Sequence, residues 1–219
     1  MKINYLTKNI IFGIVVLIFI AVWGFAFSFL TKYLDRWLAL ALPLLVYFIA
    51  LLFIKRTNNF ISGFIGERDI DEELKSLGTD FICINDGLDT GHGNIDKIVI
   101  GPTGVWALEV KSHKVHVTFD GNVLLNWGKP FVEGDFLKQA YAEAKTLQDM
   151  LKSKLDLDIN VQPVVVFSNK LAKVRFGLDK QKGVYVIQRA WLKKLLTETH
   201  VQSLDSVTLL KIKEILKVS

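Results

Sequence analysis

The stretch Asn94–Lys111, which reads NIDKIVIGPTGVWALEVK, decides the fold of this chain. Two apolar segments, Asn94–Ile100 and Val105–Lys111, flank the residues Gly101–Gly104, which include a proline and two glycines. Proline and glycine favour a tight turn, and β-branched residues favour strands. The stretch therefore predicts a β-hairpin.

Four ionisable side chains interrupt this apolar hairpin; Lys97 should point away from Asp96, which leaves Asp96, Glu109 and Lys111 to be considered together. If Ile100 pairs with Val105, Asp96 lies directly opposite Glu109, and their Cβ atoms are about 4.5–5.5 Å apart. Lys111 then shares the face of Glu109, because side chains alternate along a strand. Two carboxylates and an ammonium group would meet at one point of the sheet.

Two alternatives to this arrangement stay open. A type I turn with a glycine bulge would pair Gly101 with Val105 and turn Glu109 away from Asp96. The charges could also form a cross-strand salt bridge on a solvated face. Apolar residues on both faces of the hairpin favour burial on both sides, as in sheets that are covered by helices.

The opposed carboxylates indicate a metal site. Like charges repel, so a sheet that holds them usually supplies a cation, a proton or a basic neighbour. Mg²⁺ takes one or two carboxylates and keeps several waters, which suits this spacing. We expect Mg²⁺ at Asp96 and Glu109, with Mn²⁺ as the alternative ion.

The rest of the globular part has the pattern of an α/β protein. Helices with an apolar stripe are expected over about 65–77 and 135–154. Further strands are expected over about 80–85, 114–119, 122–127, 162–168 and 183–187, and short helices over about 189–197 and 204–217. This order predicts a mixed sheet flanked by helices.

The N-terminus contains two charge-free apolar runs, Ile10–Leu30 and Trp37–Ile54. Each run is long enough to cross a bilayer as a helix. We therefore expect a transmembrane hairpin over residues 1–56, which contacts the lipid bilayer through residues 10–54, and a globular domain over residues 57–219.

Basic residues beside the apolar runs set the expected topology. Lys2, Lys8, Lys55 and Arg56 outnumber the two basic residues of the loop between the runs. The positive-inside rule therefore favours cytoplasmic ends and a cytoplasmic domain. The single cysteine, Cys83, rules out an internal disulfide and agrees with a reducing compartment.

The net charge of +5 comes entirely from the N-terminal part. From residue 57 onward the chain has 21 basic and 21 acidic residues, so bulk charge gives no support for nucleic-acid binding. A basic loop could still contact phosphates, although a solvated loop is the plainer interpretation. This loop contains Lys170, Lys173, Arg175, Lys180 and Lys182.

Histidines and tryptophans give weaker signals. On one strand, His113 and His116 would face opposite ways, which argues against a shared zinc ion. Trp106 and Trp127 are expected to pack in the core or on the sheet rather than to stack on bases.

An ordered set of short motifs spans most of the globular part. These motifs are Gly66-Glu67, Asn94-Ile95-Asp96, Gly104-Val105, Leu108-Glu109-Val110-Lys111, Trp127 and Gln139. With them, the region from Gly66 to about Leu196 resembles the NERD domain, the nuclease-related domain of the PD-(D/E)XK nuclease-like superfamily. The resemblance implies a restriction-endonuclease-like α/β fold, here preceded by two transmembrane helices. Lys97 and Gly134-Asp135 depart from the usual family pattern.

The resemblance also implies roles for the hairpin residues. In that superfamily the aspartate and the acidic residue of the E-x-K triplet bind magnesium, and the lysine positions the attacking water. Asp96 and Glu109 would then be metal ligands, with the Val110 carbonyl as an additional ligand. Lys111 would orient the water.

Two further residues are placed at the site by the resemblance alone. Glu67 corresponds to a first-helix glutamate, and Gln139 would contact water, metal or phosphate. Without the resemblance, Glu67 could simply favour the dipole of its helix, and Gln139 could be an exposed helical residue.

The expected function is that of a membrane-anchored, Mg²⁺-dependent nuclease-like enzyme that hydrolyses phosphodiester bonds of DNA. The same site could act on RNA, because a fold does not fix a substrate. The alternatives are a catalytically silent nuclease-fold module tethered to the membrane, and a membrane sensor whose hairpin assembles oligomers.

Overall fold

The chain divides into two compact units, Met1–Phe60 and Ile61–Ser219. The structure, a computed structural model, describes residues 18, 21–29, 31–32, 41, 44–49, 66–85 and 94–217. In the first unit, residues 21–29 and 44–49 are helical.

The two expected membrane spans, residues 10–30 and 37–54, lie largely outside the described residues. Within the part that is described, no helix combines the length and the apolar character needed to cross a membrane.

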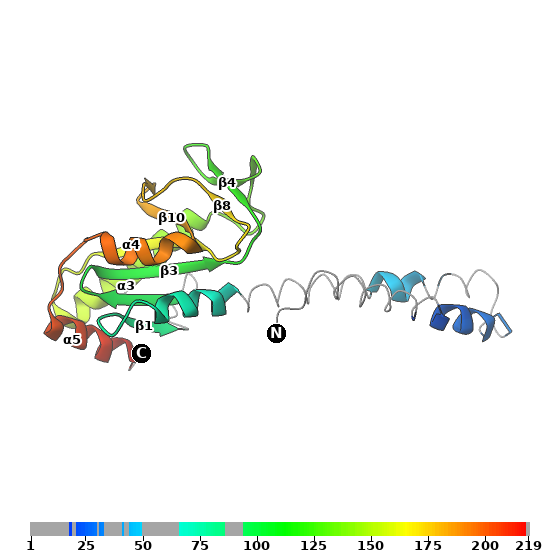
Figure 1. The fold of residues 1–219 in the computed structure, drawn as a ribbon, viewed down its shortest axis with the longest axis horizontal. Helices are drawn as coiled ribbons and strands as arrows, with labels where there is room; N and C mark the ends of the chain where they lie inside the picture. The colour runs from blue at the N-terminus through cyan, green and yellow to red at the C-terminus, as the bar shows by residue number, and fades with distance from the viewer. Residues whose placement is uncertain are drawn as a thin grey trace. The chain divides into compact units, whose positions relative to one another are not determined.

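The second unit is built on a six-stranded mixed sheet with the order β1-β2-β3-β7-β10-β9 (Figure 1). β2 pairs antiparallel with β1 and β3, β7 pairs parallel with β3 and β10, and β9 pairs antiparallel with β10. The strands span Ile82–Asn85 (β1), Lys97–Gly101 (β2), Gly104–Lys111 (β3), Val161–Phe167 (β7), Lys180–Gln181 (β9) and Val184–Gln188 (β10). The expected mixed sheet is therefore present.

The β2–β3 hairpin has the register that brings the charged residues together. Ile100 pairs with Val105 and Gly101 with Gly104, so the bulged alternative is wrong. The turn is fixed from outside the hairpin, because the buried Thr103 hydroxyl donates a hydrogen bond of 2.6 Å to the carbonyl of Leu196.

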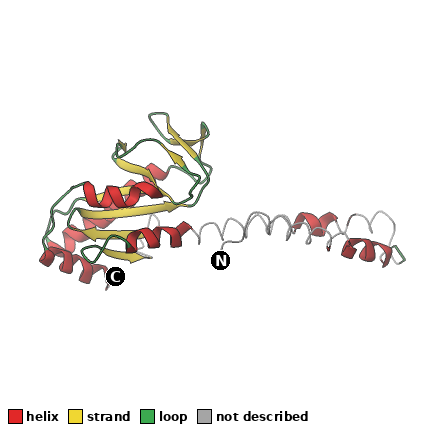
Figure 2. Cartoon of the chain, viewed as in Figure 1, coloured by secondary structure: helices red, strands yellow, loops and turns green. Residues whose placement is uncertain are grey.

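Helices cover both faces of this sheet (Figure 2). α3 (Phe136–Leu155) and α5 (Ser206–Lys217) pack on the face that carries Ile98 and Ala107. Helix 66–75 and α4 (Leu192–Glu198) pack on the face that carries Val99 and Trp106. A short 3-10 helix, η1 (Arg189–Trp191), directly precedes α4. The apolar hairpin is thus buried on both sides, as its sequence predicts.

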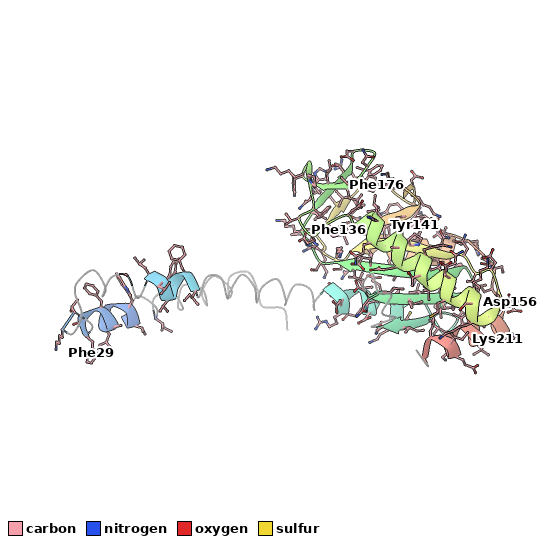
Figure 3. The ribbon with its side chains drawn as sticks, turned by 180° about the vertical axis from the view of Figure 1, so that it is seen from behind. Phe29, Phe136, Tyr141, Asp156, Phe176 and Lys211 are labelled. Atoms are coloured by element: carbon pink, nitrogen blue, oxygen red, sulfur yellow. The ribbon has the colours of Figure 1, made fainter. Side chains whose placement is uncertain are left out.

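α3 crosses the sheet along its whole length, from Phe136 towards Asp156 (Figure 3). Its N-terminus is capped by Asp135, whose carboxylate accepts hydrogen bonds from the amides of Leu137 (3.0 Å) and Lys138 (3.2 Å). The cap fixes the first turn, and the first turn sets which side chains of α3 face β3.

A second, four-stranded sheet with the order β6-β5-β4-β8 packs beside the N-terminal half of α3. Its strands are His116–Phe119 (β4), Leu124–Asn126 (β5), Lys129–Pro130 (β6) and Lys173–Val174 (β8). The sequence predicts β4 and β5 but not β6, β8 or β9, because two-residue strands are too short to show a period-2 pattern.

Candidate metal centre at the hairpin

Asp96 and Glu109 meet at the end of the hairpin. Asp96 lies one residue before β2, and its Oδ2 accepts a hydrogen bond of 2.7 Å from the backbone amide of Val110. Burial, followed by repulsion from Glu109, raises the pKa of Asp96 to about 6, although the Val110 amide and Lys111 oppose the shift. The two carboxylates therefore share one electrostatic environment.

Lys111 supplies the positive charge at this point. Its Nζ is 2.5 Å from Oε1 of Glu109, two residues earlier on the same face of β3. The ammonium group also lies 4.4 Å from the ring centroid of Phe136, at the start of α3. Lys111 is therefore held between a carboxylate and an aromatic ring.

Glu109 has one oxygen to spare. Its side chain is only 4% exposed, and its Oε2 is buried with no hydrogen-bond partner among the described residues. A buried carboxylate oxygen without a partner is costly unless a cation or a water satisfies it. The geometry therefore fits an additional ligand at this atom.

Gln139 links the hairpin to α3. Its Nε2 donates hydrogen bonds to Oε1 of Glu109 (3.0 Å) and to Oε1 of Glu143 (2.9 Å). The side chain is half-buried at the site, and the alternative of an exposed helical glutamine is wrong.

Glu143 belongs to the same cluster and is missing from the residues that the sequence suggests. Only 1% of it is exposed. Burial raises its pKa to about 7 against the effect of the Gln139 hydrogen bond, and interactions with Glu109 and Asp96 add to the rise. The signal was its position four residues after Gln139, which places both side chains on one flank of the helix.

Glu67 reaches the edge of the cluster from helix 66–75. It is exposed, and its charge makes a small contribution to the raised pKa of Asp96. Gly66 explains the approach: a Cβ at this position would overlap Oγ of Ser168 and lie 2.9 Å from Cβ of Ser112. Only glycine lets the helix start so close to the ends of β3 and β7.

The cluster offers two hairpin carboxylates rather than a complete protein cage. No group of three or more His, Cys, Asp or Glu side chains among residues that the structure describes could hold a metal ion. A zinc site at the histidines therefore finds no support in the described part, where Nε2 of His113 lies 2.9 Å from Glu133. Two carboxylates with open positions suit Mg²⁺, which retains much of its water.

Other charged and aromatic residues take structural positions. Lys97 points away from Asp96 and lies 2.7 Å from Asp71 of helix 66–75. Trp106 is fully buried, as expected. Trp127 is 65% exposed and lies in a turn, so it is not a core residue; its ring contacts His116 of β4.

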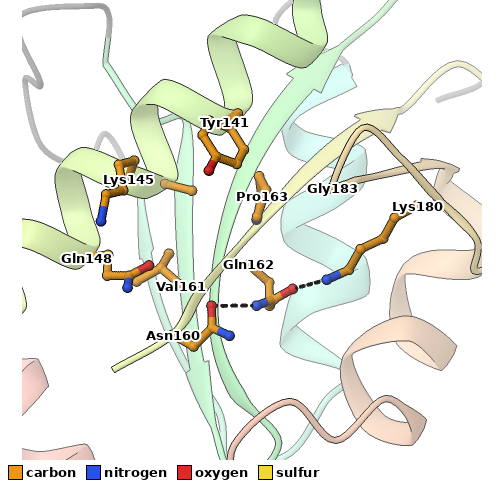
Figure 4. A pocket seen from close by; sticks show the side chains of 10 residues that line it. Tyr141, Lys145, Gln148, Asn160, Val161, Gln162, Pro163, Lys180 and Gly183 are labelled. Carbon is orange, nitrogen blue, oxygen red and sulfur yellow. Dashed lines mark hydrogen bonds between the residues drawn. The ribbon is translucent and has the colours of Figure 1, made fainter. Parts of the chain in front are cut away.

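The basic loop does not form one free surface. Nζ of Lys180 donates a hydrogen bond of 2.6 Å to Gln162 and lies 4.7 Å from the ring centroid of Tyr185. It lines a cavity of about 190 Å³ beside α3, together with Tyr141 and Lys145 (Figure 4). None of the residues of the acidic cluster lines this cavity.

One of three comparisons with known proteins found a match. Residues 62–168 match the family described as NERD, nuclease-related domain. No curated protein and no solved structure matches the chain. The match includes Glu67, Asp96, Glu109, Val110, Lys111, Gln139 and Glu143. A match to a nuclease-related domain is therefore found at residues 62–168, in a unit that has a mixed sheet between helices.

Proposed function

We propose that the protein is a membrane-anchored, Mg²⁺-dependent nuclease-like enzyme that hydrolyses phosphodiester bonds of nucleic acid, with DNA as the expected substrate. The observation that carries this proposal is the convergence of Asp96, Glu109 and Lys111 at the end of one hairpin. The match to a nuclease-related domain supports the same class of function.

Asp96 and Glu109 would hold the ion, and the Val110 carbonyl is proposed as a further ligand. Oε2 of Glu109 supports this assignment, because it is a buried acceptor without a partner in the described structure. When bound, Mg²⁺ supplies a water of lowered pKa and neutralises charge on the phosphate. Mn²⁺ accepts the same oxygen ligands.

The other side chains of the cluster position the reactants. Lys111 would orient the attacking water, since Glu109 and the Phe136 ring fix its ammonium group. Gln139 would hold the Glu109 carboxylate in place through its amide. Glu67, exposed beside the cluster, would contact the hydration shell of the ion.

Nucleic acid is the proposed partner of this centre. Of the basic loop, Lys170, Lys173 and Arg175 are exposed and remain candidates for phosphate contacts. Lys180 and Lys182 are already engaged with Gln162 and with Asn122, respectively.

The membrane anchor rests on the apolar residues of the first unit. Helices 21–29 and 44–49 expose large apolar side chains, such as Phe25 (78%) and Phe48 (62%). Exposed apolar surface of this kind marks a membrane or protein contact. The proposal places these helices in the bilayer and the second unit in the cytoplasm.

Cleavage of DNA and RNA by the full-length protein in detergent tests the enzyme assignment. Asp96→Ala and Lys111→Ala should each lower Mg²⁺-dependent cleavage by about 100-fold or more, and EDTA should abolish it. The matched controls are Asp149→Ala and Lys145→Ala, which remove an exposed ion pair elsewhere on α3. Equal cleavage by the wild type and the two site variants would contradict the proposal.

A catalytically silent module is the second candidate. The ion pair between Lys111 and Glu109 favours it, because that pair already neutralises one of the two carboxylates. In that case Mg²⁺ would leave the NMR resonances of Asp96 and Glu109 unperturbed, and no substrate would be cleaved.

A further inference from the structure

Trp127 occupies a backbone position that suits few residues. β5 and β6 pair Asn126 with Lys129, so Trp127 and Gly128 form a two-residue hairpin loop. Both have positive φ, 51° and 77°, as in a type I′ turn. Asn-Gly is the preferred sequence in this turn, whereas a bulky residue with positive φ is strained.

Core packing does not offset this strain. Trp127 is 65% exposed, and the ring contact described for it is an edge contact with His116, at 5.0 Å between centroids. The second sheet therefore displays a large aromatic side chain at a strained position, a combination typical of functional sites.

The ring lies at one end of a basic row across the second sheet. Val117 pairs with Asn126, and directly beyond this pair the amide of Trp127 donates a hydrogen bond of 3.0 Å to the carbonyl of His116. The two rings are in edge contact, so Trp127 lies beside His116, which alternates with the buried Val115 and Val117 and faces away from the core. Lys173 pairs with His116 on the other side and is exposed. The row is thus Lys173 on β8, His116 on β4 and Trp127 directly after β5.

The charged residues on the strands of this sheet are basic, Lys129 and Lys173. The four strands of the second sheet contain no acidic residue. Arg175, exposed two residues after Lys173, continues the positive charge beyond the end of β8. An exposed aromatic ring among cations is the arrangement with which proteins bind unpaired nucleotides.

The row is also close to the acidic cluster along the chain. His116 follows Lys111 by five residues, which limits the distance between their Cα atoms to about 18 Å. The connecting His113 contacts the ring of Phe136, on which the Lys111 ammonium rests. A short stretch of bound nucleic acid can therefore reach both the row and the acidic cluster.

We propose that the row Lys173, His116 and Trp127 is a platform for single-stranded nucleic acid. Trp127 stacks on an unpaired base, and Lys173 and Arg175, at the other end of the row, contact the phosphates of neighbouring nucleotides. The inference rests on the proposed function in one respect, since it names single strands as the substrate class of the acidic centre; binding to the platform requires neither metal nor hydrolysis.

Binding of fluorescently labelled oligonucleotides to the full-length protein in detergent and EDTA tests the platform. The probes are oligothymidine, oligouridine, an abasic strand of equal length and a duplex. The test variants are Trp127→Asn and Lys173→Gln. The matched control is Lys75→Gln; Lys75 is exposed on helix 66–75, which packs on the face of the main sheet opposite α3.

Trp127→Asn should weaken binding of oligothymidine and oligouridine by about 5–150-fold, the range of one lost base stack. It should leave the affinity for the abasic strand within about twofold, and its Tm should equal or exceed that of the wild type, because Asn-Gly suits the turn. Lys173→Gln should weaken all three single strands, and Lys75→Gln none of them.

Unchanged oligothymidine binding by Trp127→Asn would overturn the platform, as would equal loss on the abasic strand. A lowered Tm with unchanged binding would show that Trp127 has a structural role only. Binding to phosphatidylserine vesicles that needs Trp127, with no oligonucleotide binding, would assign the face to a membrane surface instead. Cleavage is measured separately with Mg²⁺: binding without cleavage counts against hydrolysis alone, and cleavage that does not depend on Trp127 counts against the platform alone.

Discussion

At the scale of single residues, the acidic cluster is tuned by burial and by repulsion between its own members. Asp96 and Glu143 have pKa values raised to about 6 and about 7, and Gln139 and Lys111 partly compensate the charge of Glu109. Without a bound cation, Asp96 and Glu143 therefore keep protons in the folded protein at pH values at which the unfolded chain has released them.

This proton uptake predicts how stability depends on pH. A carboxyl group whose pKa is raised by folding contributes its full stabilisation when the pH is below its pKa in the unfolded chain, which is 4.5 for Glu143. This stabilisation is lost as the pH rises to the pKa in the folded protein, about 7. The side chain in Glu143→Gln cannot ionise. As the pH rises from about 4.5 to about 7, we therefore expect the free energy of unfolding of the variant to increase by roughly 1–3 kcal/mol relative to that of the wild type.

Urea unfolding of both proteins across this pH range, without metal, measures the difference. Carboxylates whose pKa values are lowered, such as Asp120 and Asp205, make stability change with pH in the opposite direction. Because both proteins contain them, their effect cancels in the difference between the two free energies of unfolding. A gap that is constant or shrinks with rising pH would contradict the assignment of Glu143.

Single residues also show what sequence reasoning could and could not find. Asp96, Glu109 and Lys111 were predictable because alternation along two strands fixes their face once the register is known. Glu143 was not selected, because an acidic residue on a helix is ordinarily solvated, and only the tertiary contact with Gln139 shows otherwise. The exposed turn at Trp127 was not predicted, because it depends on β6, a strand of two residues.

At the scale of elements, the start of helix 66–75 decides how the site is enclosed. Gly66→Ala would push the new methyl group into Ser112 and Ser168, at the ends of β3 and β7. We expect a loss of about 1–3 kcal/mol in the free energy of unfolding. The additional change Ser168→Ala removes the closest atom and should restore part of the loss in urea unfolding. Full additivity of the two changes would contradict a direct clash.

The same helix is tied to the hairpin by a buried ion pair. Lys97 is 5% exposed and lies 2.7 Å from Asp71, with Asn85 as a second partner at 3.3 Å. Removing one partner leaves a buried charge, so Asp71→Ala should cost about 2–4 kcal/mol. Lys97→Met should cost less, because the apolar chain replaces the ammonium group without leaving a charge behind. Thermal unfolding of the two variants compares them, and a larger loss for Lys97→Met would contradict this reading.

The pattern of the elements explains why the fold was largely predictable. The hairpin, β7 and β10 are strongly apolar, and α3 is long and has an apolar stripe. The second sheet depends on pairing between β4 and β8, which are far apart in sequence. Such contacts leave no local signal, so the sheet that displays Trp127 could not be derived from the sequence.

At the scale of the whole molecule, the proposed function assigns membrane attachment to the first unit and chemistry to the second. A fragment of residues 61–219 contains the whole described acidic cluster and its supporting helices. We expect it to unfold cooperatively on its own and to stay in solution, whereas the full chain sediments with membranes and resists alkaline carbonate. Membrane binding of the fragment equal to that of the full chain would contradict an anchor in residues 10–54.

The central claim is that the hairpin carboxylates hold a divalent cation. Anomalous diffraction from crystals of the fragment soaked in Mn²⁺ tests it most directly, because the ion itself gives the signal. We predict one strong peak within about 2.0–2.3 Å of oxygens of both Asp96 and Glu109, absent in Asp96→Ala. Two results would contradict the account. One is the lack of an anomalous peak at these oxygens in crystals soaked to saturation in Mn²⁺, and the other is a peak of undiminished height in Asp96→Ala.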